Sequence, residues 1–134
     1  MNAYFILIIA MKFYATKPNN LVINIEGVSS TKGNIRCALY RSSDKFLDEK
    51  NNYKYKIVSA KNSQLVFENL NADTYALAVF HDENKNGILD KNIFGVPTEK
   101  YGFSNNARGI FSAPSFSEAA INLKSDKTVS IFLK

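Results

Sequence analysis

Apolar and polar residues alternate with a period of two in short segments of this chain, and this alternation constrains the fold more than any other feature. In the first segment Leu21, Ile23 and Ile25 occupy alternate positions. Successive side chains of a strand point to opposite faces of a sheet, so this spacing gives the segment one apolar face. The segments with strand character are 21–26, 35–40, 53–58, 65–67, 74–80, 119–123 and 128–133. Seven short strands separated by turn residues, without a long helical pattern, predict an all-β fold, a seven-stranded antiparallel β-sandwich.

Three segments have features that predict their place in this sandwich. Lys54 and Lys56 occupy alternate positions of one segment, as in an edge strand. Segment 74–80 is almost wholly apolar, which favours a central strand. Segment 70–75 consists of a leucine, a tight turn and Tyr75, as in a tyrosine corner, where the hydroxyl donates a hydrogen bond back to the backbone. The alternative is that Tyr75 is an ordinary strand aromatic.

Composition and charge exclude several kinds of site. The chain has 134 residues, 46% of them hydrophobic, which suits one packed domain. A single Cys excludes an intramolecular disulfide and a cysteine zinc cluster. The single His81 excludes sites that need two imidazoles, and we expect it to be a hydrogen-bonded structural residue. The net charge of +5 comes from scattered lysines without a basic run, so we expect no nucleic-acid partner.

The amino terminus contains an apolar stretch at residues 3–11. This stretch is too short to span a bilayer as a helix, but it has the length of an export-signal core. Lys12 interrupts it, and Phe13 stands where a cleavage site before Thr16 would need a small residue. An N-terminal strand or a wrongly assigned start remains the alternative. We expect an atypical signal peptide at 1–15, a single domain at 16–134, no transmembrane segment in the mature chain, and a periplasmic or secreted location.

Residues 82–117 form the longest stretch without a convincing strand or helix. Typical connections are about four to six residues long, and much longer ones tend to be functional or disordered. Phe94, Tyr101, Phe103 and Phe116 are among its aromatic residues, which are too numerous for a disordered segment. We therefore expect an ordered loop over one end of the sandwich, and we expect function to lie there.

This loop opens with the pattern D-x-N-x-N-G-x-x-D. An EF-hand-type loop places oxygen ligands at positions 1, 3, 5, 7 and 9 and glycine at position 6. The candidate calcium ligands are Asp82, Asn84, Asn86, Ile88 (through its carbonyl) and Asp90. Position 12 is Ile93 instead of a bidentate Glu, so the expected affinity for Ca²⁺ is weak, on the order of 10⁻⁴ to 10⁻³ M. Asp, Asn and Gly also favour turns without a metal, so a plain Asx-rich turn stays open.

A second part of the loop combines aromatic, amide and guanidinium groups. The candidate ligand-binding residues are Tyr101, Phe103, Asn105, Asn106 and Arg108. Aromatic rings beside amides suit a glycan or another small ligand, and Arg108 could bind a carboxylate. The alternative is that the Asn side chains satisfy their own backbone, and that Arg108 pairs with Asp82 or Glu99.

Several motifs of the chain resemble those of one bacterial family. They are the run 74–84, followed by 86–87 and 89–90, and the segments 94–97, 101–107 and 114–116. On these motifs, about residues 21–134 resemble domain-of-unknown-function family 2141. The resemblance implies an exported domain with an immunoglobulin-like or transthyretin-like β-sandwich, and it implies no reaction.

We expect a non-enzymatic binding module whose loop 82–117 contacts a small ligand, a glycan or an envelope protein, with calcium as the one candidate cofactor. One alternative is a small carboxylate-dependent hydrolase that uses a pair from Asp82, Asp90, Glu99 and Glu118. Another is a purely structural envelope module. A concave aromatic surface beside the loop would favour binding, and carboxylates converging in a pocket would favour hydrolysis. A self-satisfied loop with an exposed apolar patch elsewhere would favour the structural role.

Overall fold

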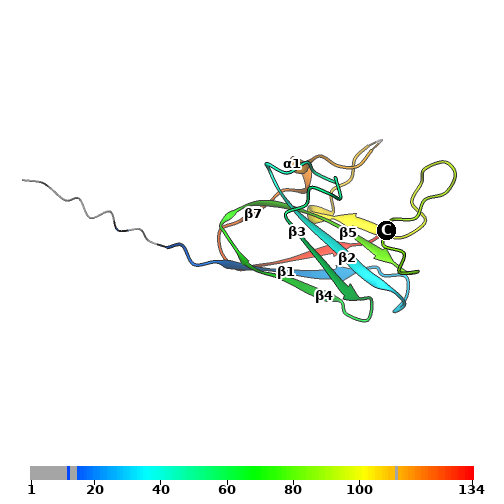
Figure 1. Cartoon of the computed structure of the whole chain (residues 1–134), viewed down its shortest axis with the longest axis horizontal. Coiled ribbons are helices and arrows are strands. Elements are labelled where there is room, and N and C mark those ends of the chain that lie inside the picture. Colours follow the sequence, from blue (N-terminus) through cyan, green and yellow to red (C-terminus); the bar gives the residue numbers. More distant parts are fainter. Residues whose placement is uncertain (1–11, 13–14, 111) are drawn as a thin grey trace, which may run out of the picture.

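Two β-sheets pack face to face in the computed structural model, which describes residues 12, 15–110 and 112–134 (Figure 1). The strands are β1 (Asn19–Glu26), β2 (Asn34–Arg41), β3 (Lys54–Ser59), β4 (Gln64–Leu70), β5 (Asp73–Asp82), β6 (Tyr101–Phe103), β7 (Ile121–Leu123) and β8 (Lys127–Phe132). Two short helices, η1 (Ser104–Asn106) and α1 (Phe116–Ala119), complete the described elements. The predicted signal peptide at 1–15 lies, apart from Lys12 and Ala15, outside the described residues. No helix among the described residues is long and apolar enough to cross a membrane.

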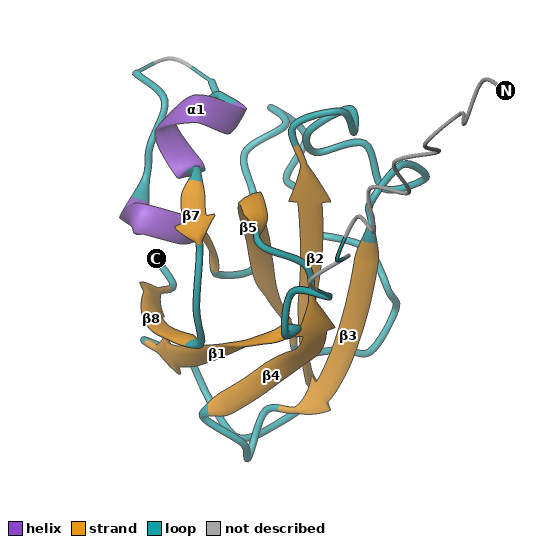
Figure 2. Ribbon diagram, turned by 90° about the vertical axis from the view of Figure 1, so that its left-hand side faces the viewer, coloured by secondary structure: helices purple, strands orange, loops and turns teal. Residues whose placement is uncertain are grey.

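The three-stranded sheet has the order β4-β1-β8, and the five-stranded sheet has the order β3-β2-β5-β6, with β7 also paired to β5. Strand β5 pairs with β2 along most of the length of β5. On its other side, β5 pairs with β6 and with β7. In Figure 2 the strands β1 and β4 run obliquely across β2 and β3. The sandwich is therefore a pair of crossed layers, with β3 and β4 at sheet edges.

The expected all-β sandwich is confirmed, with two corrections. The described residues contain eight strands instead of seven, because β6 lies inside the stretch that we expected to be a loop. Three residues are too few to produce a readable alternation. The pair β1–β8 is parallel, whereas the other pairs are antiparallel.

The core lies between the sheets and consists of the alternating apolar residues. The fully buried side chains include Leu21, Ile23, Ile35, Leu39, Leu70, Leu77, Leu123 and Ile131. Burying such a side chain contributes about 1.5–3 kcal/mol. The thiol of Cys37 lies in the same layer, and burial raises its pKa. The period-two pattern therefore reports the inner face of each long strand.

The two sheet edges are protected by the lysines that predicted an edge strand. Strand β3 is an edge of the five-stranded sheet, as expected. Lys54 Nζ lies 3.4 Å from the carbonyl oxygen of Glu68, and Lys56 Nζ donates to the carbonyl oxygen of Val66. Both acceptors belong to β4, the edge of the other sheet. Charged groups therefore cover backbone that could otherwise pair with another chain.

His81 is a structural residue, as expected, and its side chain faces the inside of the sandwich. The imidazole Nε2 lies 2.7 Å from the carbonyl oxygen of Lys32, which can only accept, so Nε2 is the donor. Nδ1 accepts a longer hydrogen bond from the Ser29 amide, at 3.4 Å. The ring thus fastens the turn between β1 and β2 to the end of β5.

The tyrosine corner is confirmed. The Tyr75 hydroxyl donates to the carbonyl oxygen of Asn71 at 2.9 Å, and the ring stacks on Tyr53 with centroids 6.2 Å apart. This hydrogen bond fixes the turn between β4 and β5. Strand β5 lies inside the five-stranded sheet, as expected of a central strand.

Replacing Tyr75 by Phe tests the contribution of this hydrogen bond. We expect Tyr75→Phe to lower the free energy of unfolding by about 1 kcal/mol, because the ring stays and only the hydrogen bond is lost. Urea unfolding followed by circular dichroism measures the change. Tyr53→Phe is the matched control, since no hydrogen bond from its hydroxyl is seen among the described residues. Equal losses in the two variants would contradict the corner's role.

Candidate functional site

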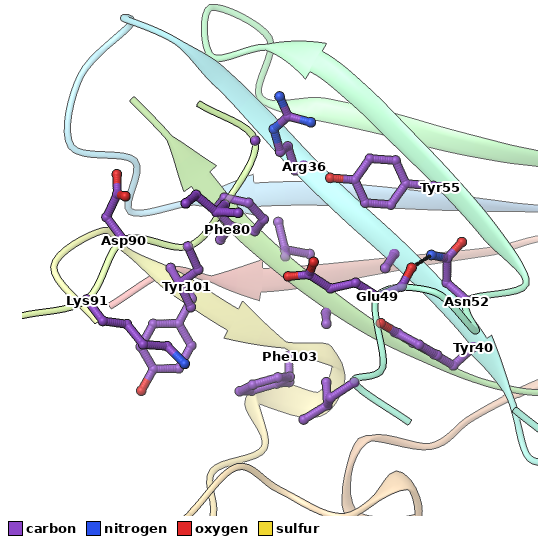
Figure 3. A pocket seen from close by; sticks show the side chains of 17 residues that line it. Arg36, Tyr40, Glu49, Asn52, Tyr55, Phe80, Asp90, Lys91, Tyr101 and Phe103 are labelled. Carbon is purple, nitrogen blue, oxygen red and sulfur yellow. Dashed lines mark hydrogen bonds between the residues drawn. The ribbon is translucent and has the colours of Figure 1, made fainter. Parts of the chain in front are cut away.

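A cavity of about 880 Å³ opens on the outer face of the five-stranded sheet (Figure 3). Its lining residues on β2 are Arg36, Ala38 and Tyr40, which alternate with the core residues of that strand. The loop 42–53 and the loop 83–100 supply the remaining walls, through residues such as Glu49 and Lys91. The cavity therefore lies on the side of the sheet that faces away from the core.

The floor of the cavity consists of two alanines between aromatic side chains. In the strand register Ala38 stands opposite Tyr55 on one side and Ala78 on the other, and Ala78 stands opposite Phe103. The side chains of this row, read across β3, β2, β5 and β6, are therefore large, small, small and large. Neighbouring strands lie about 4.8 Å apart, so the strands that carry the two rings are about 14 Å apart, and the two methyl groups form the floor of a trough between them.

The next row closes the trough at one end. Arg36 stands opposite Phe80, and Phe80 stands opposite Tyr101. The rings of Tyr101 and Phe103 meet edge to face with centroids 5.9 Å apart. Aromatic residues thus line both the wall along β6 and one end of the trough.

Phe46 holds the loop 42–53 against the sheet. Its ring packs edge to face on Tyr40, Phe103 and Phe116, with centroid distances of 5.3, 6.4 and 5.9 Å. These partners come from β2, β6 and α1. A second, smaller apolar cluster therefore exists on the outer face and fixes the wall of the cavity opposite the loop 83–100.

Arg36 joins the cavity to a buried carboxylate. The side chain of Asp82 is fully buried and lies 2.5 Å from Arg36 Nε. The same carboxylate accepts hydrogen bonds from the amides of Asn86, at 3.1 Å, and Gly87, at 3.0 Å. The Tyr55 hydroxyl and the Asp82 carboxylate both raise the pKa of Arg36. One carboxylate thus connects strand β2 to the start of the loop 83–100.

The structure brings the five candidate calcium ligands together, but their polar groups bind one another. The side-chain amide nitrogens of Asn84 and Asn86 each donate to Asp90 at 2.7 Å. The side-chain oxygen of Asn86 accepts from the Ile88 amide at 3.1 Å. Calcium takes oxygen ligands, whereas here the amide nitrogens of Asn84 and Asn86 face the Asp90 carboxylate. Among the described residues no group of three or more His, Cys, Asp or Glu side chains could hold a metal ion. These hydrogen bonds are those of an Asx-rich turn, and the calcium site stays a prediction.

Three of the four carboxylates of the hydrolase alternative lie at the turn after β5, whereas Glu118 lies in α1. Glu99 accepts hydrogen bonds from the amides of Glu83, at 3.1 Å, and Asp90, at 3.0 Å, so it ties the two ends of the turn together. Glu118 accepts from the Ser115 amide in the capping box of α1. Asp90 is the member of this set that lines the cavity. Each carboxylate has a local structural hydrogen bond.

Four of the five candidate ligand residues line one small cavity, and two of these four also line the larger cavity. Tyr101 and Phe103 line the cavity on the sheet. Asn105 donates to the carbonyl oxygens of Glu118 and Ala120, and the Asn106 side chain accepts from the Phe132 amide at 2.9 Å. Asn106 and Arg108, together with Tyr101 and Phe103, line a second cavity of about 130 Å³. Arg108 forms no ion pair with Asp82 or Glu99 in the part of the chain that the structure describes.

The sequence interpretation missed the cavity residues outside the loop 82–117. These residues are Arg36, Ala38, Tyr40, Leu47, Glu49, Asn52, Tyr55, Ala78, Val79 and Phe80. A signal was present, because Tyr40 and Tyr55 stand at strand positions that point away from the core. Whether these two tyrosines line the same cavity depends on the strand register, which the sequence pattern does not provide.

Removing the Asp82 carboxylate tests its structural role. We expect Asp82→Ala to lower the free energy of unfolding by about 2–4 kcal/mol, because it leaves Arg36 and two amides without their acceptor. Asp44→Ala, which breaks the more exposed pair with Arg41, is the matched control and should cost less. Urea unfolding measures both variants. A loss for Asp82→Ala no larger than that of the control would contradict the role.

Adding calcium to the metal-stripped protein tests the turn. We expect the melting temperature to change by less than about 1 °C up to about 10 mM Ca²⁺, with Mg²⁺ as control. An ion bound with a Kd on the order of 10⁻⁴ M would contribute about 2.7 kcal/mol at 100 times its Kd, which is several degrees for a domain of this size. A saturable rise specific for calcium would overturn the self-closed turn and support a metal site.

Comparison with known proteins gives one family. The family model described as "Uncharacterized protein conserved in bacteria (DUF2141)" matches residues 23–131. No curated protein and no solved structure gives a significant match. The matched segment contains the whole of strands β2 to β7 and with them every lining residue of the larger cavity. The chain therefore belongs to this family of uncharacterised bacterial proteins.

Proposed function

We propose that this protein is a non-enzymatic binding module and that a small ligand occupies the cavity on the outer face of the five-stranded sheet. The observation that carries the proposal is the trough over Ala38 and Ala78, with Tyr55 and Phe103 on either side. Small-ligand sites are typically concave and apolar, with a few polar groups that orient the ligand. The concave aromatic surface expected of a binding module lies beside the predicted loop, although much of it comes from β2 and β3.

The construction of the walls supports this proposal. Phe46 fixes the loop 42–53 through three aromatic contacts. Asp82 and Glu99 fix the base of the loop 83–100 through backbone hydrogen bonds. A site whose walls are fixed before binding loses less conformational entropy when the ligand enters.

The hydrolase alternative receives less support from the geometry. General acid and base groups need to face a common substrate position. Asp82 is engaged by Arg36 and two amides, and Glu118 caps α1 on another loop. Binding therefore agrees better with where the carboxylates lie.

Docking of an envelope protein is a second candidate function, favoured by one observation. The tip of the loop 83–100 exposes the apolar side chains of Ile93, Phe94 and Val96. The side-chain oxygen of Asn92 accepts from the amides of Phe94 and Val96, so the tip has a defined turn. Exposed apolar groups of this kind often mark protein contacts. This tip is separate from the cavity lining, so both functions can coexist.

We propose a periplasmic or secreted location for the module. The support is the apolar stretch at 3–11 followed by a polar segment. A ligand-binding site on a single small domain is compatible with that location.

Filling the trough tests the proposed site. The probes are choline, 3,3-dimethylbutan-1-ol, benzoate and cellobiose, each titrated into protein with ¹³C-labelled alanine methyl groups. We expect at least one probe to shift the Ala38 and Ala78 methyl signals saturably, because both methyl groups form the floor. Ala78→Leu should weaken that binding at least about tenfold, since the added side chain occupies the trough, with Ala38 as the remaining reporter.

Thr128→Leu is the matched control for this experiment. It adds the same side chain on β8, in the other sheet, and should leave binding unchanged. The proposal fails if none of the four probes shifts the floor signals, or if Ala78→Leu binds the active probe as tightly as the unaltered protein.

A further inference from the structure

The carboxylate of Glu49 points into the cavity (Figure 3). The loop 42–53 presents this residue, and the carbonyl oxygen of Glu49 accepts a hydrogen bond from the side chain of Asn52 at 2.7 Å. Among the described residues the Glu49 carboxylate has no hydrogen-bond or ion-pair partner. The backbone is therefore held, while the charge is left for another group.

Two of the other charged groups that line the cavity have hydrogen-bond partners. Arg36 is paired with Asp82, and Asp90 accepts two amide hydrogen bonds. Lys91 is exposed and comes from the outer part of the loop 83–100. The charged residues that line the cavity are two carboxylates, Glu49 and Asp90, and two basic groups, Arg36 and Lys91. The lining thus carries no excess positive charge, although the whole chain has a net charge of +5.

Aromatic faces surround this carboxylate in the cavity. Tyr40, Tyr55, Tyr101 and Phe103 are all lining residues. The face of an aromatic ring attracts a cation through its quadrupole, and the attraction grows when water is excluded. Burial raises the pKa of Tyr40 to about 12, and the negative charge of Glu49 adds to this rise. The electrostatic effect of Glu49 therefore reaches the strand that forms the floor.

We infer that the ligand of this cavity is a small organic cation, whose alkylammonium group lies between the aromatic walls and against the Glu49 carboxylate. This inference rests on the proposed function and specifies its ligand class. Rings alone would accept any apolar group, and a carboxylate alone would be satisfied by water. Their combination favours a charge that carries apolar substituents.

Choline and 3,3-dimethylbutan-1-ol form the decisive pair of probes, because they have the same shape and differ in charge. In the alanine methyl titration we expect choline to bind at least about tenfold more tightly than its neutral isostere. Glu49→Gln should abolish most of this preference by weakening choline and leaving the isostere unchanged. Glu26→Gln removes a charge from β1, away from the cavity, and should change neither affinity.

A second variant separates the rings from the charge. Tyr55→Leu keeps an apolar wall but removes an aromatic face, so it should weaken choline more than the isostere. Circular dichroism confirms that each variant is folded, and both positions are exposed enough to tolerate the change.

The outcomes distinguish this inference from the proposed function. If the isostere, benzoate or cellobiose shifts the floor signals as strongly as choline, the cation inference fails and the binding site stands. The inference also fails if Glu49→Gln keeps the preference for choline. If none of the probes reaches the floor, both proposals fail.

Discussion

The contact between Asp82 and Arg36 is the interaction on which the arrangement of the outer face depends. Asp82 ends the central strand β5, and Arg36 lies on its neighbour β2. The same carboxylate also holds two amides of the following turn. A buried carboxylate without such donors would be costly, so the turn and the arginine are required together. Strand pairing, the base of the loop and one end of the cavity are thereby fixed by a single group.

Two consecutive residues at the end of β5 hold two different turns. His81 faces the core and holds the turn between β1 and β2, whereas Asp82 faces outward and holds the turn that leads toward β6. This division follows from the alternation of side chains along a strand. It also explains why a single histidine beside an acidic turn is structural here. The two side chains serve opposite faces of one sheet.

The sequence predicted the features that depend on local pattern. Alternation identified the core strands because it reports burial directly, and Tyr75 and Lys54 were recognised from their positions relative to a turn and an edge. The Asx-rich turn could not be separated from a calcium loop, because the same oxygens accept backbone amides or bind a cation. The trough could not be predicted either. Ala38 and Ala78 become its floor only when β2, β3, β5 and β6 are paired in register, and that register is set by contacts between distant segments.

The position of the trough separates the proposed binding site from the residues that stabilise the fold. The inner face of the five-stranded sheet carries the core, so its side chains are constrained by close packing. Among the residues that the structure describes, no second sheet packs on the outer face at Ala38 and Ala78, and small side chains there contribute little buried area. Some aromatic residues on this face pack in the cluster around Phe46. The same face is open to the cavity at the trough. We therefore expect a change of shape or charge at the trough to alter the proposed binding without disturbing the sandwich, and a change on the inner face to disturb the sandwich first.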